Sequence, residues 1–150
     1  NGITCVIETG ISDMKKMTEY RLENHIPLEE ARVTISKTLG EILKQLLEMG
    51  LEATFMIIGG DTLAGFITEM DCGEITIYRE LEQGTVLSSI QTEGKEQWII
   101  SKSGGFGDQE LLMEVEQLVK HRFLEGGRKH AGSIFAYNAG NCLQRPGSAG

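Results

Sequence analysis

Apolar side chains recur at steps of three and four residues over a long stretch from Leu28 to Met49. These positions form one face of a helix, and they are Val33, Ile35, Leu39, Ile42, Leu43, Leu46 and Leu47. Glu29 and Glu30 favour the first turn because the positive end of the helix dipole attracts their charge. Gly50 is a typical residue just past a helix end. The pattern therefore predicts a helix over this stretch.

A continuous apolar run, Ala53–Ile58, follows this helix and leads directly into a pair of glycines. A run of this length without alternation is typical of a strand that is covered on both faces of a sheet. The next apolar residues, Leu63–Met70, predict a short helix that either Asp61 or Thr62 caps. The order is thus strand, glycine turn and helix.

The same order occurs a second time later in the chain. Gln97–Ser101 predicts a strand, Lys102–Asp108 a glycine-rich turn and Glu110–Val119 an amphipathic helix. Between the two units, Glu74–Tyr78 predicts a further strand and Glu82–Leu87 a turn.

The chain opens on an apolar run, Ile3–Ile7, which predicts another buried strand. Strands that alternate with helices predict an α/β fold with a mainly parallel sheet and helices on both faces. Ligands of such sheets bind beyond the carboxyl ends of the strands. We therefore expect both glycine turns to line one crevice.

Composition divides the chain of 150 residues into two parts. Residues 1–122 hold the periodic patterns and have the size of one ordinary domain. Residues 123–150 contain six of the 19 glycines and show no periodicity, which predicts a tail of uncertain origin. Because the chain begins almost within a strand, we expect it to be a fragment of a larger, two-domain protein.

Charge and cysteine usage narrow the range of partners. The chain has 14 Lys and Arg against 22 Asp and Glu, a net charge of −8, which disfavours nucleic acid and anionic membranes. Cys5, Cys72 and Cys142 lack the paired spacing of a metal or redox site, so we expect thiols in a reducing cytosol and no metal site. With no apolar run of about 18 residues, a cytoplasmic location is expected.

The two glycine turns have the parts of a phosphate site. Such a turn offers unpaired N–H groups and the positive end of a helix, and glycine lets a phosphate come close. Gly60 and Gly65 have the P-loop spacing, but Phe66 stands where that motif has lysine, and Gly105 and Gly107 lack the third glycine of the dinucleotide motif. Either turn alone is better explained as a simple connection, whereas the two together favour phosphate binding.

Three segments at these turns resemble motifs of the four-carbon acid sugar kinases. Gly59–Thr62 is similar to G-G-[D/E]-T, Glu80–Leu87 to an E-x-x-x-G-x-P-x-G-like block and Lys102–Gly107 to K-S-G-x-F-G. Their order and spacing agree with the C-terminal nucleotide-binding domain of that family over roughly residues 28–120. Three features depart from the family: Thr85–Ser88 lacks the proline and glycine, the Asp-Asp-x-Thr-Gly motif of the substrate domain is absent, and so is the serine-containing first strand.

This resemblance implies an ATP-dependent kinase that acts on threonate, erythronate or 3-oxo-tetronate, with ATP and Mg²⁺ as cofactors. The residues that it places against the nucleotide are Gly59, Gly60, Asp61 and Thr62 on one side and Ser103, Gly104 and Gly105 on the other. It assigns no catalytic residue within this chain. The sugar acid would bind through a missing N-terminal domain, so we expect the chain alone to be inactive, and a homodimer is compatible with the resemblance.

Alternatives stay open for single residues and for the whole chain. Asp61 either contacts the nucleotide or orients Mg²⁺ through water, with Thr62 supplying a hydroxyl, or it caps the following helix. Lys102 is a weaker candidate for a phosphate contact. The chain as a whole is either the ATP-binding portion of a kinase or a non-catalytic α/β module that binds a nucleotide or phosphate without phosphoryl transfer.

Overall fold

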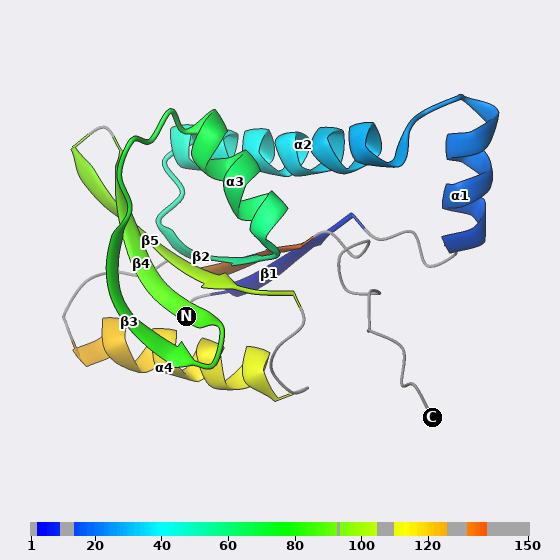
Figure 1. The fold of residues 1–150 in the computed structure, drawn as a ribbon. Coiled ribbons are helices and arrows are strands. Elements are labelled where there is room, and N and C mark those ends of the chain that lie inside the picture. The colour runs from blue at the N-terminus through cyan, green and yellow to red at the C-terminus, as the bar shows by residue number, and fades with distance from the viewer. Residues whose placement is uncertain (1–2, 10–13, 93, 105–109, 126–131, 138–150) are drawn as a thin grey trace.

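The computed structural model describes residues 3–9, 14–92, 94–104, 110–125 and 132–137 (Figure 1). In chain order, the elements are β1 (Ile3–Glu8), α1 (Met14–Glu23), α2 (Leu28–Glu48), β2 (Ala53–Ile58), α3 (Gly60–Glu69), β3 (Thr76–Glu82), β4 (Thr85–Thr92), β5 (Lys95–Lys102), α4 (Leu111–Glu125) and β6 (Gly132–Tyr137). Among these described segments, no helix has the length and hydropathy needed to cross a bilayer.

The six strands form one mixed sheet in the order β1-β6-β2-β5-β4-β3. The three pairs β1-β6, β6-β2 and β2-β5 are parallel. Strand β4 is antiparallel to both of its neighbours, β5 and β3. The expectation of a mainly parallel sheet was therefore wrong. The reason is two tight turns, at Gly84 with φ 72° and at Gly94 with φ 78°, because strands that a short hairpin joins must run in opposite directions.

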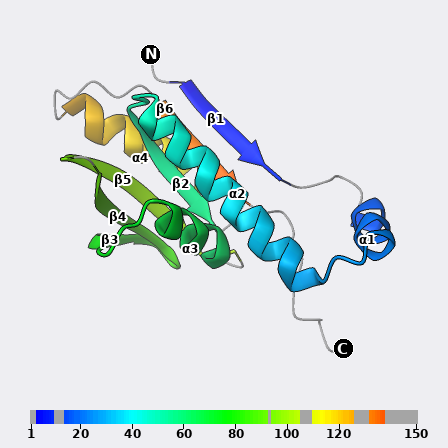
Figure 2. The same cartoon turned by 90° about the horizontal axis from the view of Figure 1, so that it is seen from above.

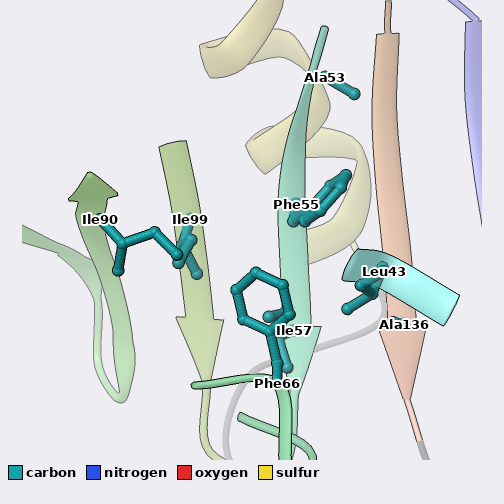
Figure 3. Packing of buried hydrophobic residues seen from close by; sticks show 8 residues of the cluster. All are labelled: Leu43, Ala53, Phe55, Ile57, Phe66, Ile90, Ile99 and Ala136. Carbon is teal, nitrogen blue, oxygen red and sulfur yellow. The ribbon is translucent and has the colours of Figure 1, made fainter. Parts of the chain in front are cut away.

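Helices cover both faces of this sheet, as predicted. On one face, Phe55 and Ile57 of β2 pack with α2 and α3, and Phe66 of α3 meets Phe55 edge to face at 5.9 Å between ring centroids (Figure 3). On the other face, Met56 of β2 and Ile100 of β5 pack against α4. Because successive side chains of a strand point to opposite faces, β2 contributes to both cores. Its burial confirms the prediction of a strand that is covered on both sides.

The strongest sequence patterns were confirmed nearly to the residue. Helix α2 and strand β2 begin where the periodicity placed them, β5 contains the predicted strand, and α4 contains the predicted helix except for Glu110. Three elements were missed: α1, which lies in a polar segment and sits away from the sheet (Figures 1 and 2), most of β4, which was interpreted as a turn, and β6, which lies in the expected tail.

The strands nearest the two chain ends also differ from expectation. Gly132–Tyr137, within a segment that showed no periodicity, forms β6 and pairs with both β1 and β2. Ala136 is fully buried there. Conversely, β1 lies at the edge of the sheet, and Val6 is 55% exposed, so the opening strand is not a buried one. Residues 138–150 of the expected tail lie outside the described residues.

Two glycines let α2 and α3 approach each other closely (Figure 2). A Cβ at Gly40 of α2 would lie 2.7 Å from the carbonyl oxygen of Gly65 on α3, and a Cβ at Gly65 would overlap the carbonyl oxygen of Ser36. The two backbones are therefore in direct contact. Gly65, which the sequence grouped with the turn glycines, lies inside α3 and serves this contact instead.

We predict that Gly65→Ala destabilises the fold by about 1–3 kcal/mol, because the added methyl group forces the two helices apart. Urea unfolding of the chain measures this change. Gly73→Ala is the matched control, since nothing lies within 4 Å of a Cβ there, and we expect it to change stability by less than about 0.5 kcal/mol. Equal effects of the two substitutions would contradict the packing role of Gly65.

Candidate functional site

The two glycine turns lie side by side at one edge of the sheet. Strands β2 and β5 are parallel neighbours, and their last residues, Ile58 and Lys102, are paired. The N–H of Gly59 donates to the carbonyl oxygen of Lys102 over 2.9 Å. The carboxyl ends of parallel strands meet at the same edge, so the described residues of both turns share this edge, whereas the expected crevice stays a prediction.

The turn between β3 and β4 joins them at the same edge. Ser103 donates its N–H to the carbonyl oxygen of Gly84 over 2.9 Å, and its hydroxyl donates to the same oxygen over 3.3 Å. The N–H of Gly84 in turn donates to Oε1 of Glu80 over 2.9 Å. All three sequence blocks that resemble the kinase motifs therefore meet here, although they are spread over more than forty positions of the chain.

The turn from β2 into α3 presents free backbone donors. Gly59 is the N-cap of α3 with φ 101° and ψ 133°, a conformation that favours glycine, and no side chain caps the helix. The first N–H that bonds within the helix is that of Leu63, to Gly59. The N–H groups before it have no intrahelical acceptor. Nothing lies within 4 Å of a Cβ at Gly60, so a phosphate has room to approach.

The carboxylate of Asp61 does not cap α3 but pairs with Arg32 of α2. Nη2 of Arg32 lies 2.6 Å from Oδ2 of Asp61, and Nη1 lies 3.3 Å from Oε1 of Glu29. The hydrogen bond and the charge of Asp61, together with the charge of Glu29, raise the pKa of Arg32. The side chains of Arg32 and Asp61 are 38% and 47% exposed, so the pair borders solvent beside the first turn of α3.

Sequence reasoning missed Arg32. It lies 29 positions before Asp61, within a helix whose apolar pattern predicts only that one face packs against the core. No motif includes it, and the interhelical contact that brings it to the turn has no local signal in the sequence. Arg32 lies one helical turn before Ser36, which touches Gly65. Its position beside α3 therefore follows only when the close approach of the two helices is known.

Thr62 has a different environment from Asp61. Its side chain is 0% exposed, and its Oγ1 has no hydrogen-bond partner among the described residues, as is also true of Oγ of Ser36. The hydroxyl of Thr62 therefore does not face open solvent at the edge. The group that Thr62 presents to the turn is its backbone N–H.

The second turn is described only in part. Nζ of Lys102 donates to the carbonyl oxygen of Ser103 over 3.1 Å, so this lysine lies along its own turn. Gly104 follows in a turn conformation. Gly105, also predicted to contact the nucleotide, lies outside the described residues, and α4 begins at Leu111.

The described side chains could bind a metal ion only if other ligands, such as phosphate oxygens and water, complete its coordination. Within those parts of the chain, no three His, Cys, Asp or Glu residues gather closely enough to hold a metal ion. Mg²⁺ in nucleotide sites takes one or two protein carboxylates, with phosphate oxygens and water for the rest. Asp61 is a carboxylate of this kind at the edge of the first turn, so the residues suit Mg²⁺ that the nucleotide brings.

Strand ends that present backbone donors at a helix N-terminus are a common arrangement of phosphate-binding sites in α/β domains. The family comparison agrees with this geometry. Residues 1–112 match the model of the nucleotide-binding C-terminal domain, so this chain belongs to that family. The match includes β1 and α1, which the sequence resemblance had left out. No curated protein matches the chain.

Among solved structures, a domain of unknown function (DUF1537) from Bordetella bronchiseptica, crystallised with bound citrate as a domain-swapped dimer, shares the fold. It aligns with a TM-score of 0.51 at 15% identity over 80% of this chain, which spans 33% of that chain's length. A structure concerned with PTPN18 and HER2 tyrosine phosphorylation sites aligns with a TM-score of 0.34 at 12% identity, over 66% of this chain and 42% of that one, and supports no inference.

The backbone of Gly59 generates a prediction about stability. We expect Gly59→Ala to cost about 1–3 kcal/mol because its φ of 101° is strained for any residue with a Cβ. Gly60→Ala, one position later, is the control: its φ is not positive and its surroundings are open. Urea unfolding of both variants checks the difference, and equal stability would show that the turn relaxes without glycine.

Proposed function

We propose that this chain is the ATP-binding portion of a kinase that phosphorylates a four-carbon sugar acid of the threonate, erythronate or 3-oxo-tetronate type. The observation that carries the proposal is the meeting of the Gly59, Gly84 and Ser103 turns at one sheet edge. These turns hold the three motifs that resemble the four-carbon acid sugar kinases, and the chain belongs to a nucleotide-binding family. Their convergence is what one shared ligand site requires.

Backbone groups supply most of the binding in this proposal. The free N–H groups of Gly60, Asp61 and Thr62 at the N-terminus of α3 donate to phosphate oxygens, and the dipole of this ten-residue helix adds to the attraction. Ser103 and Gly104, with Gly105, form the other wall. Phosphoryl transfer depends mainly on positioning and on charge neutralisation, so a site built of backbone donors suits it.

In the same proposal, ATP supplies the transferred phosphoryl group and its Mg²⁺ neutralises the phosphate charge. Asp61 orients that ion through water or contacts the nucleotide directly. The surplus of acidic residues in this chain does not oppose such binding, because helix N-termini and metal ions act over short distances.

The acceptor is proposed to bind outside this chain. The DUF1537 structure is about three times as long as the part that this chain covers, which leaves room for a substrate domain. That structure contains citrate, a small carboxylic acid, and a sugar acid carries the same carboxylate. It is also a dimer, and a homodimer is therefore part of the proposal.

The proposal is tested by calorimetric titration of Mg·ATP into the chain. We expect saturable binding, and we expect Gly60→Ala to weaken it at least about tenfold because the added methyl group takes the space of a phosphate oxygen. Gly73→Ala should bind as the unchanged chain does. A folded chain that takes up no Mg·ATP would contradict the proposal.

The kinase assignment needs a second measurement on the protein with its substrate domain. Release of ADP in the presence of threonate, erythronate or 3-oxo-tetronate supports the proposed activity. Binding of ATP without turnover of any of these acids would instead indicate a module that binds the nucleotide and transfers nothing.

A further inference from the structure

We propose that Arg32 is a nucleotide-binding residue, which donates its guanidinium to a phosphate group at the N-terminus of α3, and that Asp61 holds it in place until the nucleotide binds. This inference rests on the proposed function, which it extends by one residue outside every motif of the sequence. It concerns the described residues Glu29, Arg32, Ser36, Asp61 and Gly65.

The first support is position. The contact between Gly40 and Gly65 locks α2 against α3 backbone to backbone, and Ser36 lies in the same contact. Arg32 is one helical turn before Ser36, so it emerges where α3 begins. Its bond of 2.6 Å to Asp61 places the guanidinium beside the first turn of α3, whose first N–H groups have no intrahelical acceptor.

The second support is the chemistry of the group. A guanidinium presents several N–H donors in one plane and suits phosphate better than an ammonium group does. In the structure, Nη2 and Nη1 of Arg32 already donate to the carboxylates of Asp61 and Glu29. Both acceptors are anionic oxygens, as phosphate oxygens are, and the side chain stays 38% exposed. A phosphate can therefore replace one carboxylate as the acceptor of an Nη donor.

The third support is charge balance. Arg32 stands between two carboxylates, so the three side chains together carry one negative charge, and the Mg²⁺ that the nucleotide brings offsets its repulsion of the phosphates. When Arg32 turns to the phosphate, Asp61 loses its cation and becomes free to face the water shell of the Mg²⁺ that the nucleotide brings. The same carboxylate thus positions Arg32 in the free protein and suits the metal ion in the complex.

The experiment is titration of Mg·ATP into the unchanged chain, Arg32→Gln and Lys37→Gln. Lys37 is the matched control because it lies on the same helix and pairs with Glu41 in an exposed i,i+4 contact at 3.7 Å. We expect Arg32→Gln to weaken binding about 10- to 100-fold, the effect of one lost charged hydrogen bond, and Lys37→Gln to leave it within about twofold. Urea midpoints of the two variants should agree, since both remove exposed pairs.

Two outcomes separate this inference from the proposed function. If the unchanged chain binds no Mg·ATP, the proposed function fails and the inference fails with it. If the unchanged chain binds and Arg32→Gln binds equally well, the inference alone is overturned. Should Arg32→Gln lower the urea midpoint, Arg32→Lys decides: it keeps the charge and the pairing with Asp61 but not the planar fork, and we expect intermediate affinity. Affinity equal to that of the unchanged chain would overturn the inference.

Discussion

The close contact of α2 and α3 is the constraint on which the candidate site depends. Two helices packed through larger side chains lie about 8–10 Å apart, and a Cβ at Gly40 or Gly65 would prevent the approach seen here. Because the backbones touch, α2 cannot slide along α3. The register between the helices is thereby set, and so is the position of Arg32 opposite Asp61. The contact between Gly40 and Gly65 therefore determines that the charge of Arg32 lies beside the first turn of α3.

The mixed sheet has a consequence for the site as well. In a sheet with parallel strands alone, the two glycine turns would still meet, since β2 and β5 are neighbours. The hairpin of β3 and β4 adds a third turn at the same edge, because β4 runs against β5 and begins where β5 ends, with Thr85 paired to Lys102. Gly84 then accepts both bonds of Ser103. The antiparallel hairpin of β3 and β4 thus holds Ser103, the residue that follows β5, through its hydrogen bonds to Gly84.

Strong local patterns made part of this fold predictable. Helix α2 and strand β2 have long or continuous apolar patterns, and both were found where predicted. Strand β4 was missed because its buried positions include Ser88 and Ser89, which look like loop residues until neighbouring strands cover them. Strand β6 was missed because glycines surround a short run whose burial depends on β1 and β2, distant in sequence. Of the site, the expectation that the two turns lie together followed from the repeated order of strand, glycine turn and helix. Arg32 could not be predicted, because its position depends on an interhelical contact.

The pairing of Arg32 with Asp61 is better explained by binding than by stability. Exposed ion pairs contribute about 0–1 kcal/mol to folding, and this one is 38% and 47% exposed. The helices are held by the Gly40–Gly65 contact and by the buried Phe66, which do not involve the charges. A phosphate can therefore exchange with the Asp61 carboxylate at little cost to the fold. A positive charge close to the phosphate matters more to this ligand than the net charge of the chain, because salt screens the distant carboxylates.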